Sequence, residues 1–254
     1  MGQRSIGAYD LRERVARYDA DMEVMHPNRR KMVQVALGVL PFPRTSPLLA
    51  LDLGVGTGYF SAQFLQQFPS SRVVAVDGAE TMVEFARVRL RSLAARVVYR
   101  VGDFRNLASL VSDVHAVDVV FSSYALHHLG RVEKEAVVRQ AVGLLRPGGW
   151  FLNADVIIAD SAEIERRIQE IRVAGIVERA AGADERFRDT ASTRRFLDEL
   201  EAREGDQPLT LRDDLAILRR AGLCSPSVFW LEYREMVYGG IARWFTEAGS
   251  DRAG

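Results

Sequence analysis

The chain has 254 residues, and its 34 Lys and Arg residues are balanced by 34 Asp and Glu residues. Because no excess of positive charge exists to attract polyanions, we expect no nucleic-acid partner and no anionic membrane surface. One cysteine, Cys224, excludes an internal disulfide framework and a multi-cysteine zinc site. The sequence shows no secretory signal and no apolar segment near the roughly 18 residues of a bilayer span, so a soluble, cytoplasmic protein is expected.

Two helices are predicted in the first 45 residues. Residues 8–19 mix charged and apolar side chains at helical spacing, and residues 28–40 carry an apolar stripe. Pro27 precedes the second helix, and Pro41 and Pro43 follow it. We therefore expect residues 1–45 to form a helical cap.

From residue 48, short apolar runs alternate with helical periodicities. Strands are expected at 48–53, 72–76, 97–101, 118–121 and 150–157, and helices at 59–68, 81–93, 107–112 and 132–145. Such alternation is typical of a mostly parallel sheet covered on both faces. Residues 46–160 are therefore predicted to form a doubly wound α/β core, with Pro147, Gly148 and Gly149 as the turn before the fifth strand.

Residues 161–205 interrupt the alternation. They contain 11 acidic and 9 basic residues, with isoleucines at helical spacing, which predicts a pair of charged amphipathic helices inserted after the fifth strand. The role of this insertion remains open: it is either a lid over the ligand cleft, or a solvated edge of the helical bundle or a face that joins two copies in a homodimer. Residues 206–254 are expected to complete the core with a helix at 211–221, strands at 227–232 and 235–238, and a final short helix.

The strongest local signal is a strand that runs into three alternating glycines, Leu51-Asp52-Leu53-Gly54-Val55-Gly56-Thr57-Gly58. Glycines at such a place let the backbone turn sharply and touch a bound ligand. The loop lacks the Gly-Lys-Ser/Thr ending of a phosphate-binding P-loop. It also misses the third glycine of a dinucleotide fingerprint, where Tyr59 stands, so an NAD-dependent oxidoreductase is disfavoured.

Acidic residues follow the next two strands. Asp77 ends the second strand, in the position of a carboxylate that accepts hydrogen bonds from ribose hydroxyls. Gly102-Asp103-Phe104 follows the third strand, and an acid beside an aromatic ring suits an adenine amino group and base. Together with the glycine loop, these residues predict an adenosine that lies across adjacent strand ends.

These motifs, with Phe121 to Leu129 and Leu144 to Gly149, resemble those of the class I S-adenosylmethionine-dependent methyltransferases. The resemblance implies a seven-stranded Rossmann-like sheet, S-adenosyl-L-methionine as cofactor, and methyl transfer to a small molecule, which we interpret as an enzyme of secondary metabolism. It also implies the residues of the cofactor site, which are Tyr18, Asp52, Gly54, Gly56, Gly58, Asp77, Gly78, Asp103, Phe104 and Ser122.

The candidate bases on the acceptor side are His127, His128, His26, Tyr124 and Asp155, of which His127, His128 and Asp155 are preferred because they follow strands four and five. In the alternative interpretation, a histidine only packs the loop and Asp155 caps the insertion. The histidines have no recognisable metal-ligand spacing, so no metal is predicted. Two further functions stay open, namely non-methylating chemistry with the same cofactor and a non-catalytic partner protein.

Overall fold

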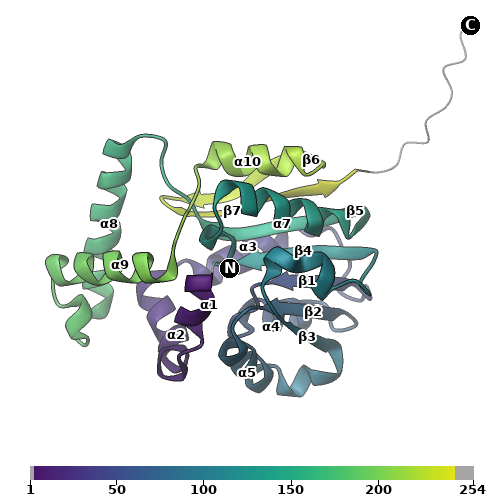
Figure 1. Cartoon of the computed structure of the whole chain (residues 1–254), viewed down its shortest axis with the longest axis horizontal. Helices are drawn as coiled ribbons and strands as arrows, with labels where there is room; N and C mark the ends of the chain where they lie inside the picture. Colours follow the sequence, from purple (N-terminus) through teal and green to yellow (C-terminus); the bar gives the residue numbers. More distant parts are fainter. Residues whose placement is uncertain (1–2, 244–254) are drawn as a thin grey trace, which may run out of the picture.

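A seven-stranded sheet forms the centre of the computed structural model, which describes residues 3–243 (Figure 1). The strand order is β3-β2-β1-β4-β5-β7-β6. Strands β1 to β5 pair in parallel, and β7 runs antiparallel to both β5 and β6. The strands are β1 Leu49–Leu53, β2 Arg72–Asp77, β3 Val97–Val101, β4 Val117–Ser123, β5 Leu145–Val156, β6 Leu223–Glu232 and β7 Glu235–Ala242. The predicted doubly wound, Rossmann-like class is confirmed.

Helices cover both faces of the sheet. They are α1 Gln3–Tyr9, α2 Arg12–Met25, α3 Arg29–Gly38, α4 Tyr59–Gln67, α5 Glu80–Arg89, α6 Leu107–Leu110, α7 Arg131–Gly143, α8 Ala162–Ala180, α9 Thr190–Glu204 and α10 Leu211–Arg220. Strand β1 shows how the two faces divide, because Leu51 and Leu53 join one buried cluster with α7 and α10. Its neighbour Ala50 joins the opposite cluster with α3 and α4. A strand buried on both faces explains the continuous apolar run in the sequence.

The segment after β5 contains the helices α8 and α9. Helices α8 and α9 stand at one end of the sheet, beside α1 and α2 (Figure 1). Met25 of α2 packs into a separate apolar cluster with Val173, Ile176 and Leu197 of the insertion. The insertion and the N-terminal helices therefore form one helical layer over the carboxyl ends of the strands.

The structure corrects three details of the predicted elements. Strand β5 begins at Leu145 and includes Pro147 to Gly149, because Gly149 lets the backbone approach closely: a Cβ there would lie 3.0 Å from the Val117 oxygen. The single helix predicted for residues 8–19 is interrupted at Asp10, between α1 and α2. Asp10 accepts hydrogen bonds from the backbone nitrogen and the hydroxyl of Thr81. Strand β7 continues to Ala242, and the rest of the predicted final helix lies outside the described residues.

None of the helices within residues 3–243 has the length and apolarity that crossing a membrane requires.

Candidate functional site

The glycine loop follows β1 and has left-handed backbone at three positions. The φ angles of Gly54, Gly56 and Gly58 are +80°, +51° and +81°, which glycine adopts without steric penalty. A Cβ on Gly54 would lie 2.4 Å from the Ala125 Cβ, and one on Gly58 would lie 3.2 Å from the Ala86 Cα. At Gly56, by contrast, no described heavy atom lies within 4 Å of an added Cβ. Gly54 and Gly58 therefore permit close packing, whereas Gly56 leaves open space at the loop.

Asp77 ends β2 and ties the loop to the neighbouring strand. Its side chain is fully buried, and its two oxygens accept hydrogen bonds from the backbone nitrogens of Gly56 (2.8 Å) and Ala79 (2.9 Å). Burial raises the pKa of Asp77 above its usual range. Each carboxylate oxygen still has a second lone pair, which leaves it able to accept a ligand hydroxyl.

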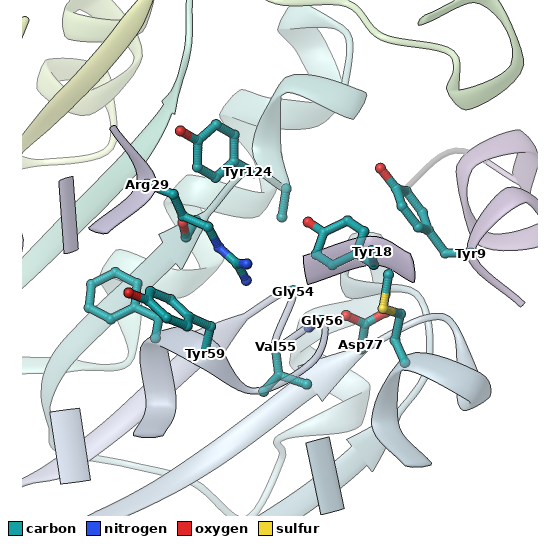
Figure 2. A pocket seen from close by; sticks show the side chains of 13 residues that line it. Tyr9, Tyr18, Arg29, Gly54, Val55, Gly56, Tyr59, Asp77 and Tyr124 are labelled. Atoms are coloured by element: carbon teal, nitrogen blue, oxygen red, sulfur yellow. Dashed lines mark hydrogen bonds between the residues drawn. The ribbon is translucent and has the colours of Figure 1, made fainter. Parts of the chain in front are cut away.

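A pocket lies between the loop and the first two helices, and we call it the strand-end pocket. Gly56 and Asp77 form its floor, and Tyr9, Tyr18 and Tyr124 stand around it (Figure 2). Its volume is about 30 Å³. Pockets for small molecules usually measure roughly 300–1,000 Å³. The rings of Tyr9 and Tyr18, which meet edge to face with centroids 6.0 Å apart, narrow the space above Asp77.

Two of the predicted cofactor residues, Asp52 and Ser122, lie beneath the pocket and do not line it. Asp52 accepts a hydrogen bond of 2.6 Å from Ser61, and burial raises its pKa to about 7. Ser122 is fully buried and donates to the Leu53 oxygen at 2.7 Å. Its neighbour Ser123 lines the pocket instead. In this structure, Asp52 and Ser122 support the loop from below.

The three predicted residues after β2 and β3 stand at the edge of the site. Asp103 accepts hydrogen bonds from the backbone and guanidinium of Arg105 at 2.5–2.9 Å. Burial opposes ionisation of Asp103, but these bonds outweigh it and lower its pKa. Phe104 is fully buried. Gly78 lies under α1, because a Cβ there would meet Ile6 at 2.7 Å. None of the three lines the strand-end pocket.

A larger cavity of about 300 Å³ adjoins the strand-end pocket, and we call it the cap cavity. Side chains of α1, α2, α8 and α9 surround it, and Tyr9, Tyr18 and Tyr124 line both spaces. Three ion pairs join charged residues that line it, and they are Arg14–Glu204, Arg172–Glu201 and Arg186–Asp21. A fourth lining residue, Arg17, pairs with Asp184 outside the lining.

His127 faces the cap cavity and is held by Asp155. Its Nδ1 lies 2.6 Å from the Asp155 Oδ1, and its backbone nitrogen donates to the Oδ2 at 3.1 Å. Asp155 is fully buried; burial alone would raise its pKa, but the charge and hydrogen bond of His127 lower it to about 2. Burial likewise opposes the charged form of His127, yet Asp155 and Asp206 raise its pKa. The structure thus brings together two of the three preferred catalytic residues.

His128 packs behind His127, with the two rings 4.1 Å apart. It is 1% exposed, and burial followed by the charge of His127 lowers its pKa to about 4. Its Nδ1 lies 2.9 Å from the Oδ1 of Asp206, in the segment after α9. His128 is therefore a neutral ring near physiological pH.

Comparisons with known proteins agree with this geometry. Residues 50–149 match a family model described as a methyltransferase domain. An uncharacterized methyltransferase of Geobacillus kaustophilus is 30% identical over 127 residues, which cover 50% of this chain and 55% of that protein. These matches identify residues 50–149 as a methyltransferase domain, and they support a class I S-adenosylmethionine-dependent type.

Solved structures show the same fold as this chain. An O-methyltransferase family protein from Burkholderia thailandensis superposes with a TM-score of 0.61 and 21% identity, over 88% of this chain and 58% of the other. Human N-acetylserotonin methyltransferase, solved with S-adenosylmethionine, superposes with a TM-score of 0.59 and 16% identity. The superposition covers 95% of this chain and 59% of the human one. The chain spans about half the length of the curated relatives it matches.

S-adenosylmethionine is the cofactor of this family, and the groups that line the strand-end pocket suit its binding. Gly56 offers open space at a left-handed turn, and the buried Asp77 offers acceptor oxygens beside it. The carboxyl ends of β1, β2 and β4 meet there, where doubly wound folds bind nucleotides. The space itself is narrow, so Tyr9 and Tyr18 have to move for a ligand of this size to enter.

Three residues in or beside the candidate site escaped the sequence analysis. Tyr9 was one of many aromatic residues, and nothing in its neighbourhood marked it. Glu235 accepts hydrogen bonds from Tyr124 (2.6 Å) and lies 3.1 Å from the His26 Nδ1, an arrangement that antiparallel β7 creates. Asp206 follows a long insertion, 78 residues after His128. The sequence signal available for Asp206 was its position, because it is an acidic residue directly after the charged insertion.

Proposed function

We propose that this methyltransferase transfers the methyl group of S-adenosylmethionine to a small molecule bound in the cap cavity. The observation that carries the proposal is the wall shared by the two spaces, in which Tyr9, Tyr18 and Tyr124 line both. A donor in the strand-end pocket and an acceptor in the cap cavity would meet at these rings. The cavity volume of about 300 Å³ suits a small acceptor better than a macromolecule.

The cofactor supplies a methyl group already activated by a positively charged sulfur, so the protein has to align the two partners. Such alignment contributes up to about 7–11 kcal/mol in favourable systems. Gly56 and Asp77 would hold the donor, and Tyr124, with its hydroxyl fixed on Glu235, would stand between donor and acceptor. Tyr124 has a φ of +48°, and strained backbone of this kind is common where a side chain has to be aimed at a ligand.

His127 is the residue best placed to receive a proton from the acceptor. Asp155 accepts from the Nδ1 side, so the neutral ring presents the Nε2 lone pair on its other edge. His128 supports this position by packing against the His127 ring. In this proposal His127 is the base, Asp155 positions it, and His128 positions it from behind.

The insertion would close the cap cavity. Phe196 and Leu200 of α9 and Arg172 of α8 line the cavity opposite His127. We therefore favour the lid over the dimer face. The balanced charge argues against a nucleic-acid partner, and the single cysteine fits a reducing, cytoplasmic setting. The high arginine content is compatible with an enzyme of secondary metabolism.

The test is a transfer assay with methyl-labelled cofactor and three acceptor pools, namely a small-molecule extract, RNA and protein. We expect label in the small-molecule pool, with loss of at least tenfold in rate for His127→Gln and little change for the exposed His115→Gln. Label in RNA or protein would contradict the small acceptor. Cofactor binding without transfer to any pool would favour non-methylating chemistry or a partner role.

A further inference from the structure

The side chains of His127, His128 and Asp206 come together beside the cap cavity, and their facing atoms are poorly aligned for hydrogen bonds. Within residues 3–243, neither ring nitrogen of His128 has a hydrogen-bond partner of acceptable geometry, and the same holds for the Oδ1 of Asp206. Yet His128 Nδ1 and Asp206 Oδ1 lie only 2.9 Å apart. The His127 Nε2 lies 3.7 Å from the same oxygen. Buried polar atoms that face each other without bonding require an explanation.

The spacing of these atoms suits coordination. One ligand atom from each of His127, His128 and Asp206 falls within a group 4.8 Å across. In a tetrahedral metal site with bonds of about 2.0–2.1 Å, the ligand atoms lie roughly 3.3 Å from one another. The two distances to the Asp206 Oδ1, 2.9 Å from His128 and 3.7 Å from His127, lie on either side of that value. A modest rotation of the rings would equalise them.

Asp155 provides the second feature of a metal site. It binds the Nδ1 of His127 at 2.6 Å, which fixes that nitrogen as the protonated one and leaves the Nε2 lone pair toward Asp206. Histidines that bind metals usually donate their other nitrogen to a carboxylate in this way. His127 and Asp206 line the cap cavity, so a fourth position would be open to a ligand there.

We propose that His127, His128 and Asp206 bind one divalent transition-metal ion at the wall of the cap cavity. Two imidazoles and one carboxylate suit ions such as Zn²⁺, Fe²⁺ and Co²⁺ better than Mg²⁺ or Ca²⁺, which prefer oxygen ligands. This inference deepens the proposed function by naming an acceptor class, namely a molecule with a hydroxyl or similar donor atom that can coordinate the ion. With the ion bound, His127 would be a ligand in place of the free base: coordination would lower the pKa of the acceptor hydroxyl, and its proton would leave to bulk water as the oxygen takes the methyl group.

The experiment titrates the untagged full chain, freed of metals with a chelator, with Zn²⁺ by calorimetry and with Co²⁺ by visible absorption. We expect one ion per chain at micromolar affinity or tighter. Asp206→Asn removes a charged ligand at nearly constant shape and should weaken binding by at least 100-fold. Asp155→Asn should weaken it by roughly 10- to 100-fold through His127. His115→Gln is the matched control and should leave the affinity unchanged.

A nitrogen NMR spectrum of the wild-type imidazoles keeps the test decisive if a variant misfolds. Zn²⁺ should shift the signals of His127 and His128 and leave those of His26 and His115 in place. Absence of one-to-one binding, unchanged affinity in folded Asp206→Asn, or shifts at the wrong histidines would overturn the proposal. These binding measurements need neither cofactor nor acceptor, and they therefore test the metal site independently of the proposed function. In a separate assay, methyl transfer that persists in chelator would refute the metal site and leave the proposed function intact.

Discussion

Replacing Gly56 with alanine separates the ligand role of the glycine loop from its structural role. The added methyl group meets no described atom within 4 Å, so the folded protein has room for it. Gly56 lines the strand-end pocket, so the methyl group stands in the space that a ligand would use. We expect Gly56→Ala to bind S-adenosylmethionine poorly while the protein stays folded.

The magnitudes follow from the backbone and from packing. The φ of +51° costs an alanine about 1–2 kcal/mol, which lowers the melting temperature of a chain of this size by roughly 2–8 °C. Overpacking against a ligand costs about 1–3 kcal/mol. At 1.4 kcal/mol per tenfold change, the dissociation constant of the cofactor rises roughly 5- to 140-fold.

Calorimetry with the cofactor and thermal melting measure the two effects separately. Gly182→Ala is a matched control, because Gly182 has a φ of +74° and open space but lies outside both pockets. It should show the same loss of melting temperature with normal affinity. Gly54→Ala should instead destabilise the fold strongly, since its Cβ would overlap Ala125. Normal cofactor affinity in Gly56→Ala would show that the ligand does not approach this loop.

Three further predictions concern charges. Asp77→Ala should weaken cofactor binding roughly 10- to 100-fold in calorimetry, because a charged hydrogen bond contributes about 1.5–3 kcal/mol; an unchanged constant would place the ribose elsewhere. In metal-free protein, His128 binds its proton near pH 4 when folded but near pH 6.5 when unfolded, so stability should fall by about 3 kcal/mol as pH drops through this window. Urea unfolding of His128→Gln should show a flatter pH dependence, and an equally steep one would assign the loss to other groups. Lys134→Met should cost about 3–5 kcal/mol, because it leaves Asp214, 2.7 Å from Lys134 and 1% exposed, without its counter-charge. Lys134→Met combined with Asp214→Leu should regain most of that loss in the same assay; a double variant as unstable as the single one would contradict this account.

The core of the fold was predictable because its signals are local. A buried parallel strand needs a continuous apolar run, and a sharp turn after it needs glycine, so β1 and its loop are visible in adjacent residues. The predicted start of the fifth strand, at residue 150, was wrong because Pro147, Gly148 and Gly149 are residue types that usually form turns. Only the contact with Val117 on β4, 32 positions away in the sequence, shows that the strand continues through them.

The candidate site was predictable only in part, for a related reason. Asp77 and His127 follow strands, and parallel strands bring their carboxyl ends to one edge. Asp206 and Glu235 reach the same place from a crossing insertion and an antiparallel strand, whose register no local pattern fixes. The lack of a metal-ligand spacing in the sequence was therefore a weak guide, since the third candidate ligand comes from a distant segment.

If the donor and the acceptor bind in the two pockets as proposed, the tyrosines that line both pockets would make the two binding events thermodynamically dependent on each other. Tyr9 and Tyr18 belong to helices that also pack against α9 and α8, so a ligand that displaces these rings changes the shape of the cap cavity as well. By linkage, the factor by which one ligand changes the affinity for the other is the same in both directions. If the donor opens the wall in a way that raises the affinity for the acceptor, the acceptor raises the affinity for the donor by the same factor.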